Sequence, residues 1–337
     1  MSFTYVYADC AASCPPLPCA RDAFAKWAYA NPNSAHTLGR EARVELEHAR
    51  ETIAQCINAK PEQIAFTPSA TEACRKAITY LSIKDCSQYE HKAVDDAAWW
   101  NSTFMVGGTS FAQMLANNET GEIYAGLVRE LSKERIVFTD ATAAVGQMPV
   151  DVQDLGVAAL AAGGHKFGAF PGIGFLYVRD GMKDEDTFPG TPPVALAVSM
   201  AEALKYRTEH MDEAQEYLAK QYSLLMDRIM QIHGAHFTIG KESIIHLATI
   251  LSVRFDGVNA RELLAMLDAN GVYASAGSAC TAGSDEPSRV LLASGLTKEQ
   301  ALSTIRLSFC PETAPHEFEA IARALRHCVE RVRRLTE

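Results

Sequence analysis

The stretch AGGHKFG, residues 162–168, follows an apolar run, residues 157–161, that is typical of a buried strand. A glycine-rich turn and a second apolar run, residues 175–179, come next. Lysine is almost never fully buried without a partner, so Lys166 has two interpretations. It is either a turn lysine whose amine reaches water, or a desolvated lysine whose nucleophilic amine forms a Schiff base.

Outward from this stretch, expected strands alternate with expected helices. This alternation predicts an α/β fold with a mainly parallel sheet, whose ligands bind beyond the carboxyl ends of the strands. The polar residues Asn118, Asp140 and Lys166 all stand at or just after the end of an expected strand. Their shared position favours a functional interpretation of each.

A small, hydroxyl-rich turn, residues 68–72, connects an expected strand to an expected helix. The start of a helix offers unpaired backbone N–H groups and a favourable dipole, which suit a phosphate group. The turn has no GxxxxGK[ST] motif, and taken alone it is better explained as a plain helix cap by Ser69 or Thr71.

Two further candidates lie toward the carboxyl terminus. Residues 276–283 are small and carry Cys280, and such a loop leaves a thiol accessible and reactive, unlike a cysteine buried in an apolar helix or strand. Arg306 alternates with apolar residues in an expected strand, residues 304–309. It is either paired internally or directed at an anionic ligand.

Composition restricts the class of protein. The chain has 337 residues and a net charge of −10, which argues against direct nucleic-acid binding as its main role. No segment is apolar enough to span a membrane, and the amino terminus does not resemble a signal peptide. The nine cysteines form no paired framework, so we expect reduced thiols, a cytoplasmic protein and no metal site at Cys10, Cys14 and Cys19.

A long helical segment, residues 194–232, predicts a hinge between a large and a smaller domain. We expect a large cofactor-binding domain over residues 15–205. The small α+β domain would comprise residues 1–14 and 206–337, including the loop with Cys280.

Together, these stretches resemble the cysteine desulfurases of the NifS/IscS type, within the class V aminotransferase group of fold-type I pyridoxal 5'-phosphate (PLP) enzymes. The resemblance covers almost the whole chain, in the segments NSAHTLGREA (33–42), FTPSATEA (66–73), EH (90–91), NNETG (117–121), GHK (164–166), GIG (172–174), GTPPV (190–194), and SACT (278–281) followed by EPS (286–288). It implies a compact fold-type I enzyme with a sheet of the seven-stranded type.

The resemblance also implies a role for each cofactor-binding residue. Lys166 would hold PLP through a Schiff base and then move the substrate Cα proton. Asp140 would pair with the pyridine nitrogen, and His91 would stack on the ring and act as a catalytic residue that carries a proton. The resemblance further implies that Asn118 would bond the phenolic oxygen of the ring.

The phosphate of PLP would be held by residues from two subunits. Ala70, Thr71 and His165 would bind it within one subunit. Thr191 would reach the phosphate of the neighbouring subunit's cofactor, which makes a homodimer part of the expectation.

The remaining implied roles concern the substrate. Arg306 would hold the carboxylate of L-cysteine in a two-bond fork, with Asn118 beside it. Cys280 would attack the substrate sulfur as a thiolate, giving L-alanine and a persulfide that passes to a sulfur-acceptor protein. That acceptor could serve iron–sulfur cluster assembly, tRNA thiolation, DNA sulfur modification or cofactor synthesis.

The chain departs from the family pattern in ways that leave other functions open. Ala143 replaces a glutamine, Gly163 a serine and Ser69 a glycine, and two connecting segments are short. The alternatives are a selenocysteine lyase, a C–S lyase or an aminotransferase of the same fold, none of which needs a mobile cysteine. A scaffold that has lost catalysis is a further alternative.

Overall fold

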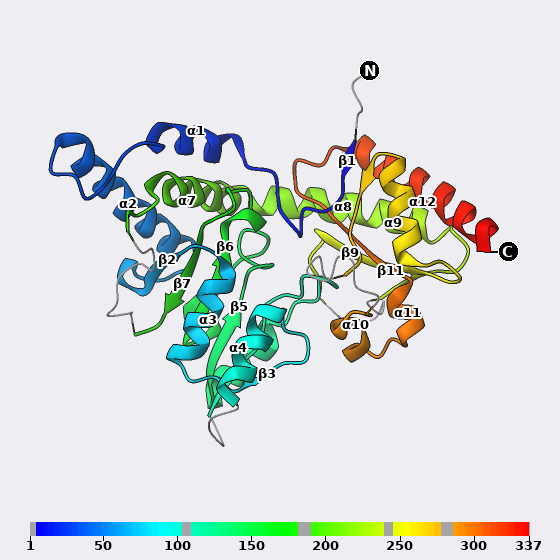
Figure 1. Cartoon of the computed structure of the whole chain (residues 1–337), viewed down its shortest axis with the longest axis horizontal. Helices are drawn as coiled ribbons and strands as arrows, with labels where there is room; N and C mark the ends of the chain where they lie inside the picture. Colours follow the sequence, from blue (N-terminus) through cyan, green and yellow to red (C-terminus); the bar gives the residue numbers. More distant parts are fainter. Residues whose placement is uncertain (1–4, 103–108, 181–189, 239–244, 278–285, 337) are drawn as a thin grey trace. The chain divides into compact units, whose positions relative to one another are not determined.

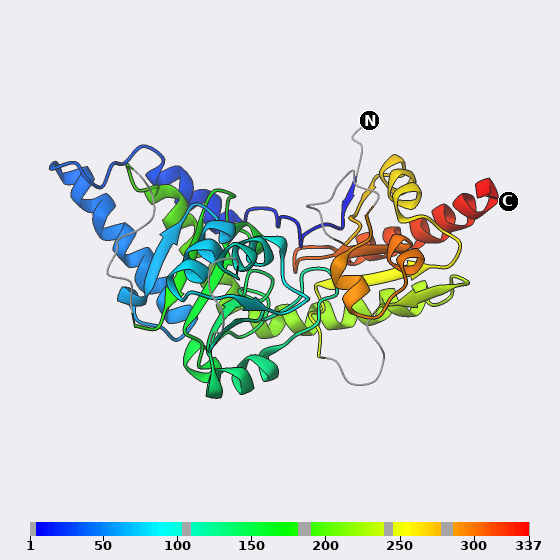
Figure 2. The same cartoon turned by 60° about the horizontal axis from the view of Figure 1, so that its bottom comes forward.

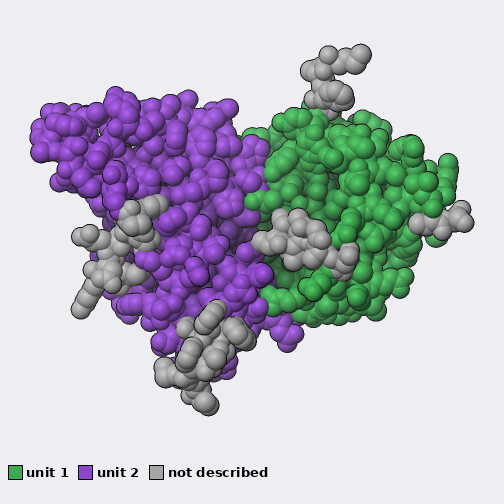
Figure 3. Space-filling model, viewed as in Figure 1, with its two compact units in different colours: residues 1–12, 117–123, 212–337 green, residues 13–116, 124–211 purple. Residues whose placement is uncertain are grey.

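A computed structural model describes residues 5–102, 109–180, 190–238, 245–277 and 286–336. The chain forms two compact units, which Figure 3 colours separately. Unit 1 contains residues 1–12, 117–123 and 212–337, and unit 2 contains residues 13–116 and 124–211. Residues 117–123, which carry the NNETG motif, thus belong to unit 1, although the sequence-based division places them in the large domain.

Unit 2 is built around one sheet with the strand order β2-β7-β6-β5-β4-β3 (Figure 1). Only β7 runs antiparallel to its neighbours. The carboxyl ends of the other five strands therefore meet at one edge. The strands are β2 (Ile64–Thr67), β3 (Asp85–Cys86), β4 (Ser110–Ala112), β5 (Ile136–Asp140), β6 (Ala159–Gly163) and β7 (Gly174–Val178). The expected α/β fold with a mainly parallel sheet is confirmed.

The described part of unit 2 contributes six strands to this sheet, where the family resemblance implied seven. The short strand β3 lies at the edge, and α4 connects it to β4. The chain between these two strands is short. The described residues there contain one helix, α4, and no further strand.

Helices line the sheet of unit 2. Figures 1 and 2 show α2 and α7 side by side, with α1 packed against α7. The helix α3 packs on β6 and β7. Alanines of α3 and of β6 permit this close approach. The helices are α1 (Pro18–Trp27), α2 (Thr37–Cys56), α3 (Ala70–Tyr80), α4 (Lys92–Ser102), α5 (Ala125–Glu134), α6 (Val152–Leu155) and α7 (Val194–Glu209), with short 3-10 helices at Pro61–Gln63 and Gly164–Lys166.

Unit 1 combines a three-stranded antiparallel sheet, in the order β11-β9-β8, with a parallel pair of β1 and β10. Buried residues of α8, α9 and α12 join the sheet residues in one apolar core. The strands are β1 (Val6–Tyr7), β8 (Ala235–Phe237), β9 (Ile250–Phe255), β10 (Val272–Tyr273) and β11 (Thr304–Ser308). The helices are α8 (Met211–Ile229), α9 (Ala260–Ala269), α10 (Arg289–Ala293), α11 (Lys298–Leu302) and α12 (Pro315–Thr336).

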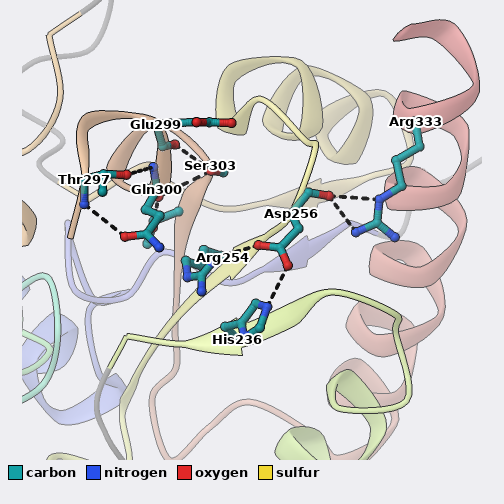
Figure 4. A network of polar contacts seen from close by, with 9 residues as sticks. His236, Arg254, Asp256, Thr297, Glu299, Gln300, Ser303 and Arg333 are labelled. Atoms are coloured by element: carbon teal, nitrogen blue, oxygen red, sulfur yellow. Dashed lines mark hydrogen bonds and ion pairs between the residues drawn. The ribbon is translucent and has the colours of Figure 1, made fainter. Parts of the chain in front are cut away.

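Asp256, at the end of β9, joins three elements of unit 1 (Figure 4). Its carboxylate accepts hydrogen bonds from Arg254 at 2.5 Å and His236 at 2.7 Å. Its carbonyl oxygen accepts one from Arg333 of α12 at 2.8 Å. The His236 contact, followed by the charge of Arg254, lowers the pKa of Asp256 despite its slight desolvation. Because the group lies at the surface, its main effect is to order β8 and β9 against α12.

In the described ranges, no helix is long and apolar enough to cross a membrane.

Candidate active site

Asp140 stands at the carboxyl end of β5, and its side chain is buried. One carboxylate oxygen accepts the backbone N–H of Thr142 at 2.9 Å, which orients the carboxylate over its own turn. Burial, followed by the charge of Asp140, raises the pKa of the Cys74 thiol in α3. A buried carboxylate with few donors is suited to a cationic partner such as a protonated ring nitrogen.

Lys166 follows the neighbouring strand β6 in a single 3-10 turn. Its carbonyl oxygen accepts a hydrogen bond from Gln147 at 3.2 Å, and the carbonyl of His165 accepts the N–H of Cys14 at 2.7 Å. These bonds fix the backbone from which the lysine side chain extends, and the side chain itself is half-buried. The lysine is thus held at the same sheet edge as Asp140.

The start of α3 reaches this edge from the end of β2. Ser69 caps the helix by accepting the N–H of Glu72 at 3.2 Å, so the helix-cap interpretation of this turn is correct. The cap leaves the N–H groups of Ala70 and Thr71 in the first turn, where a helix has no internal partners for them. The cap and a phosphate site are therefore compatible.

The close approach of β6 to α3 explains a departure from the family pattern. A Cβ atom on Gly163 would lie 3.2 Å from the Cβ of Ala70 and 3.5 Å from the His165 ring. A serine at this position would have to push against the turn. Ala70 and His165 both lie beside Gly163 at the end of β6.

These residues fit PLP by the chemistry of their donors. The first turn of α3 supplies N–H groups for a phosphate, Lys166 supplies an amine for the aldehyde, and Asp140 supplies a carboxylate for the ring nitrogen. The hydroxyl oxygen of Thr142, beside Asp140, is buried and has no hydrogen-bond partner among the residues described.

His165 has an electrostatic environment suited to a neutral ring. Desolvation, followed by the charge of Lys166, lowers its pKa from 6.5 to about 4. A neutral imidazole keeps one N–H donor, which can bond to a phosphate oxygen. His165 therefore serves this edge as a neutral donor at neutral pH.

The low pKa of His165 makes stability depend on pH in the cofactor-free protein. Between pH 6.5 and about 4 the unfolded chain binds a proton that the folded protein does not bind, so stability is lost as the pH falls through this window. The slope is at most about tenfold in the unfolding equilibrium constant per pH unit. His165→Asn should flatten the slope in urea unfolding measured at pH 7 and pH 5. The exposed control His48→Asn should keep it, and equal slopes in wild type and His165→Asn would contradict this account.

His91 follows β3 and directly precedes α4. Its Nδ1 atom accepts the backbone N–H of Ala93 at 3.2 Å, which orients the ring and places the proton of the neutral form on Nε2. His91 belongs to unit 2, together with Lys166 and Asp140. Its predicted stacking on a ring remains a prediction.

Within unit 1, Arg306 lies at the centre of β11 with 1% of its surface exposed. It donates to the carbonyl oxygen of Asn118 at 2.9 Å and to the carboxylate of Asp9 at 2.7 Å. Its Nε atom is buried and has no partner in the part of the chain that the structure describes. Arg306 is therefore paired internally, and binding of an anionic ligand through its remaining N–H groups stays a prediction.

Asp9 is a site residue that sequence reasoning missed. Its second carboxylate oxygen accepts the hydroxyl of Ser275 at 2.8 Å, so it links the amino-terminal segment to residues just before the Cys280 loop. The only sequence sign is an acidic residue at the end of a short apolar stretch, residues 5–8. Nothing local indicates a partner that lies 297 residues away.

Glu119 of the NNETG motif is also engaged in unit 1. It is buried, and its carboxylate accepts the hydroxyl of Ser288 at 2.5 Å. A Cβ atom on Gly277 would lie 2.6 Å from the same oxygen. Both described flanks of the Cys280 loop thus contact one side chain.

The structure does not reach every predicted residue. Cys280 lies outside the described residues. Thr191 is described and exposed, directly after Gly190 with its positive φ of 106°. Ala143, where the family has a glutamine, is half-buried in the turn after Asp140.

Comparison with known proteins gives a consistent result. The class-V aminotransferase family matches residues 6–96, 110–187 and 182–321. An IscS-like cysteine desulfurase from Mycobacterium tuberculosis is 32% identical over 383 aligned residues, covering 97% of each chain. A putative cysteine desulfurase, IscS 1, from Bacillus subtilis is 32% identical and covers 91% of this chain and 92% of its own.

Solved structures agree with these relatives. A NifS-like protein superposes with a TM-score of 0.84 at 25% identity, covering 99% of both chains. SspA in complex with cysteine superposes with a TM-score of 0.74 at 26% identity, covering 92% of this chain and all of its own. The chain therefore belongs to the class-V aminotransferase family and, within it, to the NifS/IscS-like cysteine desulfurases.

Proposed function

We propose that this protein uses PLP to convert L-cysteine to L-alanine, leaving the sulfur as a persulfide on Cys280. The observation that carries the proposal is the group of residues at the carboxyl edge of the unit 2 sheet. There Lys166 and Asp140 follow adjacent parallel strands, and the first turn of α3 lies beside them. The solved neighbour SspA is in complex with cysteine, which supports this amino acid as the substrate.

PLP, when bound, supplies an electron-withdrawing ring that acidifies the substrate Cα–H and polarises the C–S bond. Asp140 would hold the proton on the ring nitrogen, and the amine of Lys166 would accept the Cα proton. His91 would stack on the ring, and Asn118 would bond its phenolic oxygen. The N–H groups of Ala70 and Thr71, with neutral His165, would hold the phosphate.

The sulfur transfer balances without an added oxidant. The Cys280 thiolate attacks the substrate sulfur and forms an S–S bond. The C–S bond breaks, its electron pair goes to the substrate carbon, and that carbon takes a proton to become the methyl group of alanine. Arg306 holds the substrate carboxylate throughout, so the sulfur stays directed at Cys280.

The sulfur must then leave Cys280, so the proposal includes a sulfur-acceptor protein. It also includes a homodimer in which Thr191 contacts the phosphate bound by the neighbouring subunit. We place the protein in the cytoplasm, which is supported by the absence of any disulfide among its eight described cysteines. A selenocysteine lyase, C–S lyase or aminotransferase is not favoured, because the curated relatives are named cysteine desulfurases.

The test is alanine release from L-cysteine with a reductant present, using PLP-loaded protein. Wild type and the matched control Cys56→Ala should both release alanine, whereas Cys280→Ala should not. Release by all three proteins would remove Cys280 from the reaction. An intact cofactor absorbance band without release from any protein would overturn cysteine as the substrate, and wild type that takes up no PLP would overturn the enzyme itself.

A further inference from the structure

Glu90 is a buried carboxyl group that the proposed chemistry does not use. It lies between β3 and α4, and 2% of its surface is exposed. One oxygen, Oε1, accepts the backbone N–H of Met114 at 2.5 Å. The other, Oε2, is buried and has no hydrogen-bond partner among the described residues.

Oε1 of Glu90 accepts a backbone hydrogen bond from the chain after β4, beyond the point where β3 ends. Ser87 donates to the carbonyl of Ala112 at 3.0 Å, as the strand β3 ends. Beyond Ser87, the N–H of Met114 donates to the side chain of Glu90. The N–H of Leu115 donates to the carbonyl of Asp140 at 2.9 Å.

The unbonded oxygen shows which protonation state this site favours. A buried ionised carboxylate needs several donors or a cation to offset its desolvation. Among the described residues, Glu90 receives one hydrogen bond, and the groups whose charge affects it or is affected by it are acidic: Asp140 on β5, Cys74 on α3 and Asp95 on α4. His91 is its neighbour in the chain.

The same surroundings raise the pKa values of both Glu90 and Cys74. Burial, followed by the charge of Asp140, raises the pKa of Glu90 well above 4.5. Burial and the same carboxylate raise the pKa of Cys74. Glu90, Asp140 and Cys74 form a cluster of three buried acidic groups, which is stable when one of them carries the charge.

We propose that Glu90 is a neutral carboxylic acid in the working enzyme, which closes the sheet edge through Oε1 and leaves Asp140 as the one carboxylate behind the cofactor ring. Glu90 is a positioning residue, because it acts through Met114 and Asp140 and not on the substrate. Its link to the ring rests on the proposed function, whereas its protonation state can be measured without any turnover.

The first measurement is the infrared difference spectrum of full-length wild type minus Glu90→Gln at pH 7. Glutamine keeps an acceptor for Met114 and offers an N–H₂ group in place of Oε2. The proposal expects the carbonyl band of a protonated carboxyl group in wild type and its loss in the variant. The exposed control Glu134→Gln should leave that band in place. A carboxylate band lost from Glu90→Gln instead would overturn the proposal.

The second measurement is unfolding by urea across pH 5 to pH 8. Folded Glu90 keeps a proton that the unfolded chain releases near pH 4.5, so wild type should lose stability relative to Glu90→Gln as the pH rises. The ratio of their unfolding equilibrium constants should change about tenfold per pH unit until Glu90 ionises in the folded state. A constant ratio, with Glu90→Gln the less stable protein throughout, would overturn the proposal. PLP absorbance and alanine release by Glu90→Gln at pH 7 report separately on the proposed function.

Discussion

Lys166→Ala should lower alanine release by about 10⁴-fold, the upper range for loss of a positioned proton-transfer group. There are two reasons. The variant side chain has no amine to bind the aldehyde of PLP, and it has no base for the substrate Cα proton. Absorbance spectra of the PLP-loaded protein should also lose the band of a lysine-bound cofactor. The far-UV circular dichroism should stay unchanged, because the backbone carbonyls of this turn accept hydrogen bonds from the Gln147 side chain and the Cys14 N–H.

Lys133→Ala is the matched control for Lys166→Ala. Lys133 is exposed and paired with Glu130 at 2.7 Å, so its loss should change neither the spectrum nor the rate. Lys166→Arg separates charge from chemistry, since a guanidinium keeps the positive charge but is a poor nucleophile and base. Substantial alanine release by Lys166→Arg would show that Lys166 contributes charge alone.

Arg306→Ala should lower kcat/KM for L-cysteine by about 10²- to 10⁴-fold. Each hydrogen bond to a charged group contributes about 1.5–3 kcal/mol, and the variant loses a two-bond fork. The main effect should be on KM, because a carboxylate is bound equally before and during the reaction. Steady-state kinetics with L-cysteine measure this directly.

Arg306→Ala should also lower stability by about 3 kcal/mol, the low end of the range for breaking a buried ion pair, since the Asp9 side chain keeps 19% exposure. Arg254→Ala is the matched control: Arg254 faces Thr304 on the adjacent strand and pairs with Asp256. It should keep the KM of wild type. An Arg306→Ala protein with unchanged KM would assign the arginine a purely structural role.

Much of unit 2 was predictable because its evidence is local. The apolar runs that form β5 and β6 are continuous in sequence, and strands buried on both faces need such runs. Asp140 and Lys166 could be identified because polar residues that end buried strands are conspicuous there. The cap of α3 was also predictable, since Ser69 and Glu72 are three residues apart.

The sequence by itself determined the class of fold, the family, and the lysine and aspartate at the edge of the sheet, since each depends on residues that are neighbours in the chain. Only the tertiary structure decided the pairing of Arg306 with Asp9, the contact of Glu90 with Met114, and the place of residues 117–123 in unit 1. These depend on contacts between segments far apart in sequence, and a buried polar group takes whichever partner the packing brings to it. No local pattern of residues records that choice.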